Sequence, residues 1–260
     1  MEVDKYDEGV PSWVDLGTGD IEAAATFYAG LFGWESPELP PEAGGYRICT
    51  LRGRPVAGLG PQMNPGPPVW ATYVNTADAD AVAERVTAHG GQVLAAPFDV
   101  LDAGRMGVFA DPSGAVFSAW QPNTHQGAGL VNEPGTYSWS ELLATDAEGA
   151  LTFYPAVFGW GVNKMPPTGA PLQYVEWKLG DRSVGGMLPK PDTMPAEVPA
   201  HWGVYFAVED TDKAVEAVVL LGGQIVQPPT DIEPGRFAVV TDPTGAMFSV
   251  LAMRPTLTPG

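Results

Sequence analysis

The sequence contains nearly the same octapeptide twice, as FYAGLFGW at residues 27–34 and FYPAVFGW at residues 153–160. The match is longer than these eight residues. It opens with SWVDL against SWSEL and closes with GRMGVFADPSGAVFS against GRFAVVTDPTGAMFS, always in the same order. Self-similarity of this length indicates a duplicated module. The duplication constrains the fold more than any other feature, because two copies of one pattern predict two copies of one structure.

The duplication also indicates the domain boundaries. The stretch QPNTHQGAGLVNEPGT, residues 121–136, is polar, rich in Gly and Pro, and without hydrophobic periodicity, as expected of a linker. We therefore expect a first module at 8–124, a linker at 125–136 and a second module at 137–255. A chain of 260 residues is long for one domain and sufficient for two.

Each module has the pattern of two units, each a strand, a helix and then three strands. In the first unit, WVDLGT reads as a strand and Asp20 as a helix N-cap. Apolar residues follow at helical spacing over 21–32, and Gly33 ends the helix. A second helix is expected near 79–89. The fold class is therefore α+β, with four tandem βαβββ units in the chain. Pro155 is expected to kink or interrupt its helix.

Charge and cysteine content restrict the partners and the compartment. The formal net charge is −18, so the surface repels nucleic acid and anionic membranes, and we expect neither as a partner. The single cysteine, Cys49, permits no internal disulfide and is compatible with a reducing cytoplasm. The N-terminal stretch MEVDKYDEGV is not a signal peptide, and no apolar run is long enough to span a bilayer. These features predict a cytoplasmic protein.

Three motifs recur in both modules: D-x-x-x-A-x-x-F-Y-x-x-x-F-G-W after the first strand, Gly-Gly at the end of the second helix, and D-P-x-G before the last strand. Together they resemble the vicinal oxygen chelate superfamily, which includes glyoxalase I, bleomycin-resistance proteins and extradiol dioxygenases. The paired modules are most similar to two-module actinobacterial glyoxalase-like proteins, some of them called hydroxylases. The resemblance covers about residues 10–254 and implies sheets that curl into two cup-shaped modules.

The resemblance also implies where a metal would be held. The positions that match the superfamily's metal ligands are Trp13, Trp139, Ala71, Gly203, Ser118 and Ser249. None is a usual ligand, because divalent metals take imidazole, carboxylate or thiolate groups. We expect the three histidines, His89, His125 and His201, to be surface or structural residues. We therefore predict no metal cofactor. The alternative is a divalent metal held by an atypical set such as Asp15, Glu141 or His201.

One carboxylate in each module falls on the same strand face as these positions. Strand residues alternate between faces, so Asp15 shares a face with Trp13, and Glu141 shares a face with Trp139. A carboxylate inside an aromatic-walled cup has a raised pKa and can act as a general base or hydrogen-bond acceptor. Asp15 and Glu141 are therefore the candidate catalytic residues. The alternative is that they only satisfy backbone or arginine partners.

Aromatic and hydroxyl side chains near the cups are the candidate ligand contacts, because indole faces can stack on a planar molecule. The candidates are Trp13, Trp139, Trp70, Trp202, Tyr46, Tyr174, Ser118 and Ser249. The alternative for the four tryptophans is that they plug the cups or bury the contact between the modules.

Three functions follow from these features. The first is a metal-free protein, monomeric or homodimeric, that binds or helps to modify a planar, largely apolar small molecule of the polyketide or antibiotic type. The second is a metal-dependent enzyme of the glyoxalase or dioxygenase type with an atypical ligand set. The third is a protein-interaction module with vestigial cups. Whether the chain is an enzyme stays open; if it is one, a lyase, oxygenase or hydroxylase-type activity is expected.

Overall fold

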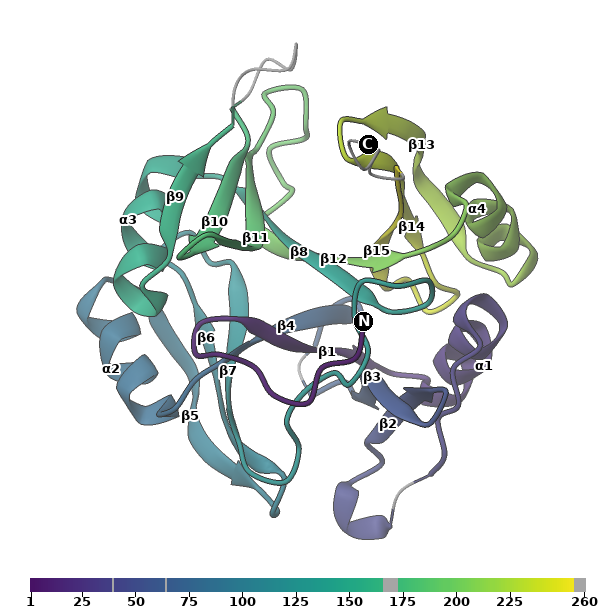
Figure 1. The fold of residues 1–260 in the computed structure, drawn as a ribbon, viewed down its shortest axis with the longest axis horizontal. Helices are drawn as coiled ribbons and strands as arrows, with labels where there is room; N and C mark the ends of the chain where they lie inside the picture. Colours follow the sequence, from purple (N-terminus) through teal and green to yellow (C-terminus); the bar gives the residue numbers. More distant parts are fainter. Residues whose placement is uncertain (39, 64, 166–172, 255–260) are drawn as a thin grey trace, which may run out of the picture.

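The computed structural model describes residues 1–260 except 39, 64, 166–172 and 255–260. Within these residues, each half of the chain forms one curved sheet, of seven strands in the first half and eight in the second. The two sheets lie back to back, and their concave faces open in opposite directions (Figure 1). Pairs of helices flank them on both sides. Each concave face is therefore built by one module alone.

The first sheet has the strand order β2-β3-β1-β4-β7-β6-β5. β1 runs parallel to β3 and antiparallel to β4, so the two units of the module meet at the middle of the sheet. The elements of this half are β1 (Pro11–Thr18), α1 (Ile21–Phe32), the 3-10 turn η1 (Pro41–Ala43), β2 (Arg47–Leu51), β3 (Arg54–Pro61), β4 (Val69–Asn75), α2 (Ala79–Ala88), β5 (Gln92–Val100), β6 (Gly104–Ala110) and β7 (Val116–Pro122).

The second sheet repeats this plan in the order β13-β14-β15-β12-β8-β11-β10-β9. Its elements are β8 (Tyr137–Ala144), α3 (Ala147–Phe158), β9 (Gly161–Lys164), β10 (Val175–Leu179), β11 (Arg182–Pro189), β12 (His201–Ala207), α4 (Thr211–Leu220), β13 (Gln224–Ile232), β14 (Gly235–Thr241) and β15 (Met247–Met253). The predicted α+β fold is confirmed. In the first unit, the strand that corresponds to β9 is reduced to an isolated bridge between Glu35 and Thr50.

Local sequence signals fix the ends of the helices. Each of the four α-helices in the described residues begins after an aspartate whose side chain accepts a backbone N–H three residues on. α1 and α3 end at Gly33 and Gly159, both in the left-handed conformation that glycine adopts without strain. The predicted cap at Asp20 and stop at Gly33 are confirmed.

Pro155 does not interrupt α3, which runs through it to Phe158. Pro155 lies in the last turn, where the missing N–H removes only the hydrogen bond to the carbonyl of Leu151. The neighbouring Tyr154 and Val157 are buried and hold the turn against the sheet. The predicted interruption is therefore wrong, because tertiary burial outweighs one lost hydrogen bond.

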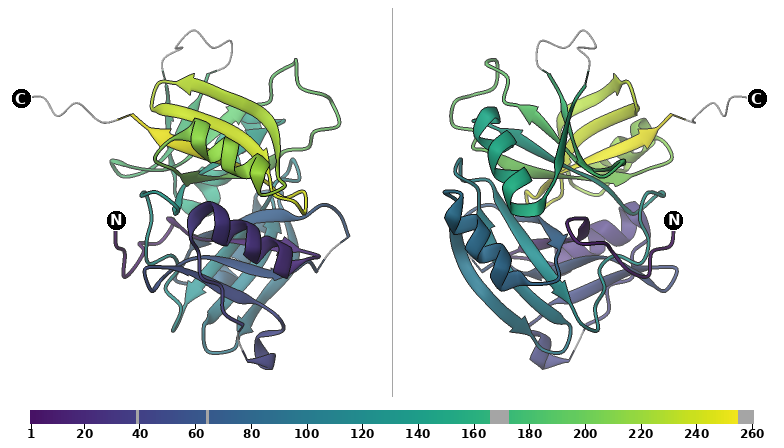
Figure 2. Two further views of the ribbon diagram at one scale, coloured as in Figure 1. Left: turned by 90° about the vertical axis from the view of Figure 1, so that its right-hand side faces the viewer. Right: turned by 60° about the vertical axis from the view of Figure 1, so that its left-hand side comes forward.

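The helices of one module pack against the helices of the other. α1 packs on α4, and α2 packs on α3, so each helix pair takes one member from each module (Figure 2). The central strands β4 and β12 also meet, and the hydroxyls of Thr72 and Ser140 lie 2.8 Å apart in a buried hydrogen bond. The two halves therefore share one hydrophobic core. In the part of the chain that the structure describes, none of the helices has the length and apolar character needed to traverse a lipid bilayer.

Candidate functional site

The concave face of the first sheet is centred on β1. Trp13 lies opposite Tyr73 of β4, and Asp15 lies beside Gly58 of β3. Tyr46, just before β2, lies flat over the glycines of β3. A Cβ atom at Gly58 would overlap the Tyr46 hydroxyl, so a larger residue here would displace this tyrosine. The missing side chain creates the space that brings the Tyr46 hydroxyl to Asp15.

Hydrogen bonds join these residues into a network that we call the first carboxyl centre: Trp13, Asp15, Tyr46 and Tyr73. The indole Nε1 of Trp13 donates to the Tyr46 hydroxyl at 2.9 Å. The Tyr46 hydroxyl donates to Asp15 Oδ2 at 3.1 Å, and the Tyr73 hydroxyl donates to the same oxygen at 2.9 Å. Ser118 lies opposite Tyr73 on the neighbouring strand β7. Tyrosines, rather than backbone or arginine groups, therefore hold this acid.

The second module builds the same network, the second carboxyl centre: Trp139, Glu141, Tyr174 and Tyr205. Trp139 Nε1 donates to the Tyr174 hydroxyl at 3.0 Å, and the Tyr205 hydroxyl donates to Glu141 Oε1 at 3.0 Å. The side chain of Tyr174 favours the ionised form of Glu141, and Ser249 lies opposite Tyr205 on the neighbouring strand β15. The structure thus brings together the predicted residues of each module, apart from Trp70 and Trp202, around one carboxyl group.

Both acids have raised pKa values. Burial raises the pKa of Asp15 to about 6, and the hydrogen bonds from Tyr73 and Tyr46 only partly offset this effect. Burial raises the pKa of Glu141 in the same way, against hydrogen bonds from its two tyrosines. The pKa values of Tyr46 and Tyr73 are also raised by burial, so both remain protonated donors at neutral pH. Asp15 can therefore exchange a proton close to neutral pH.

The Asp15 carboxyl group is also incompletely satisfied. Both tyrosine hydroxyls reach Oδ2, and within the described part of the chain no donor reaches Oδ1. Asp15 and Glu141 are partly buried, and neither residue is fully enclosed. A partly buried acid with a free oxygen can accept a ligand hydroxyl when ionised and donate to a ligand carbonyl when protonated.

Tyr73 and Tyr205 belong to the centres, although they were not among the residues predicted from the sequence. The signal was present in the paired strands WATYV and WGVYF. Tyr73 stands two positions after Ala71 and therefore shares its strand face. The same alternation applied to β4 and β12 would have identified both tyrosines.

Trp70 and Trp202 lie on the opposite faces of their strands, because each is one position away from the cup-facing residue. Trp70 Nε1 donates to the Tyr28 hydroxyl at 3.0 Å, and its ring lies 5.0 Å from that of Phe206 in the other module. Trp202 donates likewise to Tyr154 at 2.9 Å. The expectation that they line the cups needs correction: they bury the contact between the modules, and we leave them out of the candidate site.

The aspartate of each D-P-x-G turn crosses between the modules. The Tyr28 hydroxyl donates to Asp242 Oδ2 at 3.1 Å, and the Tyr154 hydroxyl donates to Asp111 Oδ2 at 2.9 Å. The Oδ1 atom of each aspartate accepts backbone N–H groups of its own turn. We call Trp70–Tyr28–Asp242 and Trp202–Tyr154–Asp111 the interface triads.

The described residues do not fit the superfamily's metal. No three His, Cys, Asp or Glu side chains in this part of the chain lie together. Asp15 and Glu141 belong to concave faces that open in opposite directions, and His201 is bonded through Nδ1 to the carbonyl of Pro199, so the atypical set is not assembled. Each carboxyl centre offers one carboxylate surrounded by protonated phenols and an indole N–H. These groups donate hydrogen bonds and do not coordinate a cation.

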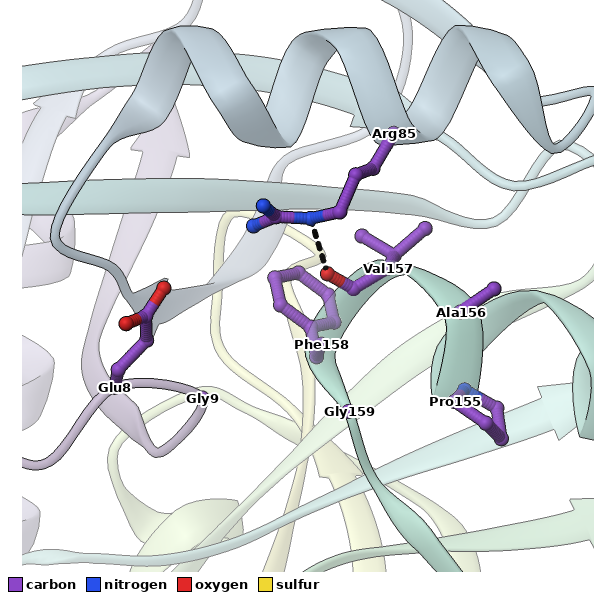
Figure 3. A pocket seen from close by; sticks show the side chains of 8 residues that line it. All are labelled: Glu8, Gly9, Arg85, Pro155, Ala156, Val157, Phe158 and Gly159. Atoms are coloured by element: carbon purple, nitrogen blue, oxygen red, sulfur yellow. Dashed lines mark hydrogen bonds between the residues drawn. The ribbon is translucent and has the colours of Figure 1, made fainter.

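A pocket of about 270 Å³ lies away from both carboxyl centres, where the end of α3 meets α2 and the loop before β1 (Figure 3). Its lining includes Glu8, Arg85 and Phe158. Arg85 Nε donates to the carbonyl of Val157 at 2.8 Å and so satisfies the last turn of α3. Arg85 therefore supports the helix end here, and the pocket brings no group to Asp15 or Glu141.

His125 lies in the linker and packs against Trp13 of the first carboxyl centre, a contact that the sequence did not predict. Its ring packs edge-to-face on Trp13, with centroids 4.4 Å apart, and lies 5.7 Å from Trp120. Burial lowers the pKa of His125 to about 4, so the imidazole is neutral at neutral pH. Its buried Nε2 has no hydrogen-bond partner within the described residues.

Comparison with known proteins gives the same picture of the fold. The model of the Glyoxalase/Bleomycin resistance protein/Dioxygenase superfamily matches residues 11–118 and 136–250. The protein CFP32 of Mycobacterium tuberculosis is 47% identical over 259 residues, covering 96% of this chain and 97% of its own. The anthracycline biosynthesis protein DnrV of Streptomyces peucetius is 39% identical over 269 residues, covering 96% and 95%.

Among solved structures, the Mn(II)-bound glyoxalase from Novosphingobium aromaticivorans matches with a TM-score of 0.65 at 18% identity, covering 94% of this chain and 82% of that one. At this identity the likeness concerns the fold alone. The family match, by contrast, spans both modules. The chain therefore belongs to the glyoxalase/bleomycin resistance protein/dioxygenase superfamily.

Proposed function

We propose that the protein binds a small, planar, mostly apolar organic molecule on the concave face of its sheets, through a carboxyl centre and without a metal ion. The observation that carries this proposal is the partly buried carboxyl group at the centre of each concave face, held by tyrosine hydroxyls and raised in pKa by burial: Asp15, whose Oδ1 has no donor in the described structure, and its counterpart Glu141. Structural acids are normally saturated with hydrogen bonds. An unsaturated acid among aromatic side chains is instead typical of a binding or catalytic site.

The surroundings favour a neutral aromatic ligand with a hydroxyl or carbonyl group. Indole and phenol rings provide the apolar contact area, and the carboxyl group provides one directional hydrogen bond. The net charge of −18 disfavours anions. The name of DnrV connects that relative with anthracyclines, and this supports a polycyclic aromatic ligand here.

The same geometry supports proton transfer to a bound molecule. The ionised carboxylate of a centre, Asp15 or its counterpart Glu141, can take a proton from a ligand phenol or an acidic C–H bond, which leaves the negative charge on the ligand and a neutral acid on the protein. The tyrosines of each centre, Tyr46 and Tyr73 in the first and Tyr205 in the second, hold the carboxyl group in place during this exchange and remain protonated. Sequestration needs only the hydrogen bond, whereas modification needs the proton as well.

A binding titration tests the proposal. The probe is quinizarin, a planar dihydroxyanthraquinone, added to chelator-treated protein while tryptophan fluorescence is recorded. We expect saturable quenching, weakened at least about tenfold in the Asp15→Asn, Glu141→Gln double variant, because each change alters the charged hydrogen-bonding group. The matched control is Arg105→Gln, which alters an exposed ion pair distant from both centres. Binding that disappears on metal removal and returns with Mn²⁺ or Fe²⁺ would contradict the proposal.

A further inference from the structure

The two carboxyl centres differ in how their tryptophans are covered. Trp13 is only 3% exposed, whereas Trp139 is half-buried and retains contact with solvent. Both indoles occupy the same position in their sheets and donate to the same kind of tyrosine. Sheet position alone therefore does not account for the difference in exposure.

The cover on Trp13 comes from the linker. His125 contacts the Trp13 ring edge-to-face, and the ring of Trp120 on β7 also packs edge-to-face on His125. The backbone after His125 is tied to the sheet, because Ala128 N donates to the carbonyl of Ser12 at 2.8 Å and the Tyr6 hydroxyl donates to the carbonyl of Ala128 at 2.7 Å. The imidazole is thereby fixed over the indole.

The second module presents its indole differently. Trp139 makes no ring contact with any residue that the structure describes, although 27 such contacts join other described residues. The repeat pairs Trp120 of the first module with Leu251 of the second, so the aromatic side chain that backs His125 is missing there. Next to this indole, Glu141 is half-buried and accepts a hydrogen bond from Tyr205.

We propose that the chain has one working site for a planar aromatic ring, on Trp139 in the second module, and that His125 is an internal plug that occupies the equivalent place in the first. This inference rests on the proposed function and specifies which concave face serves it. The ligand is a hydroxylated polycyclic aromatic molecule. Its ring lies against the Trp139 indole, and its hydroxyl or carbonyl group bonds to Glu141.

The chemistry of His125 suits a plug. A neutral imidazole is a small planar ring that can replace a ligand ring against an indole. Its Nε2 atom is buried without a hydrogen-bond partner in the described structure, so it contributes no polar contact that a smaller side chain would lose. Removal of the ring should expose Trp13 while the backbone ties of the linker remain.

The experiment is calorimetric titration of the full chain with quinizarin. We expect one molecule bound per chain in the unmodified protein, loss of at least about tenfold in affinity in Trp139→Leu, and two molecules per chain in His125→Ala. The matched control is His125→Phe, which keeps a ring over Trp13 and should retain one site. Circular dichroism of each variant checks that the fold is intact.

The outcomes separate this inference from the proposed function. Two sites in the unmodified chain, or one site whose affinity Trp139→Leu leaves unchanged, would overturn the inference and leave the proposed function standing. If His125→Ala does not fold, the Trp139→Leu titration still decides the location of the site. Absence of saturable binding in the unmodified chain and in all variants would overturn both.

Discussion

The two faces of each sheet carry the same chemistry with different consequences. On the convex face and on the concave face, an indole N–H donates to a phenol, and the phenol donates to a carboxyl group. In the first sheet these chains are Trp70–Tyr28–Asp242 and Trp13–Tyr46–Asp15. The convex chain joins two modules, whereas the concave chain stays within one.

The two acids differ in how many of their carboxyl oxygens already accept hydrogen bonds. Asp242 is 2% exposed, and both of its oxygens are used: Oδ2 by Tyr28, and Oδ1 by the N–H groups of Thr244 and Ala246. Asp15 is half-buried and has one oxygen free of donors in the described structure. Residue type therefore does not distinguish a structural acid from a functional one here, whereas hydrogen-bond saturation does.

The largest expected effect is a loss of unfolding free energy when the tryptophans of the two faces are replaced by alanine. Trp70→Ala should lower the free energy of unfolding by about 3–5 kcal/mol, because it opens a cavity in the shared core. Trp139→Ala should cost less, about 2 kcal/mol, since this side chain is only partly buried. Urea denaturation followed by circular dichroism measures both. Equal losses would show that the concave indole is as structural as the convex one.

The next effect concerns pH. The folded-state pKa of Asp15 is raised from 3.8 to about 6, so the folded protein holds this proton more tightly than the unfolded chain. The resulting stabilisation is present below about pH 4 and is lost as the pH rises through 6, by at most about 3 kcal/mol. The difference in unfolding free energy between wild type and Asp15→Asn should change by this amount across that window. A difference independent of pH would contradict the raised pKa.

Removing single hydroxyls compares the two kinds of tyrosine. Tyr28→Phe leaves Asp242 Oδ2 and the Trp70 indole N–H without their partner and should cost about 2 kcal/mol. Tyr73→Phe should cost about 1 kcal/mol or less, because Asp15 is only partly buried and water can replace the lost donor. It should also raise the pKa of Asp15 further, since the hydroxyl of Tyr73 favours the ionised form. Thermal unfolding and pH titration of both variants measure these effects, and a larger loss for Tyr73→Phe would reverse the assignment.

The smallest effect is expected on the exposed surface. Arg105 pairs with Asp80 and Asp99, and its counterpart Arg236 pairs with Asp212 and Asp231. These pairs are largely exposed and screened, so Arg105→Gln should change stability by less than about 1 kcal/mol. The change should shrink further in high salt. A loss comparable with that of Trp70→Ala would mean that the surface pairs contribute to the core of the fold.

Much of the fold and part of the site could be predicted from the sequence, because the repeat compares each module with the other. Strand alternation placed Asp15 with Trp13, and Glu141 with Trp139, on shared faces. The assignment of Trp70 to the cup conflicts with this rule, because Trp70 lies one position from the cup-facing Ala71 and so points to the opposite face. A register error of one position reverses the direction of a strand side chain.

Contacts between distant segments could not be predicted in this way. No periodic pattern connects His125 with Trp13, since the linker has no regular structure to set its path. The bond between Tyr28 and Asp242 depends on how one module packs against the other, and a repeat reports only what each module does by itself. Pro155 shows the same limit, because its local preference yields to burial in the shared core.

Carboxyl resonances in a ¹³C NMR titration test most directly whether the concave acids are the reactive ones. The Asp15 resonance should titrate with a pKa of about 6, and quinizarin should shift the Glu141 resonance while it leaves those of Asp111 and Asp242 unchanged. An Asp15 pKa near the ordinary 3.8, together with ligand-induced shifts confined to the two interface aspartates, would contradict the account.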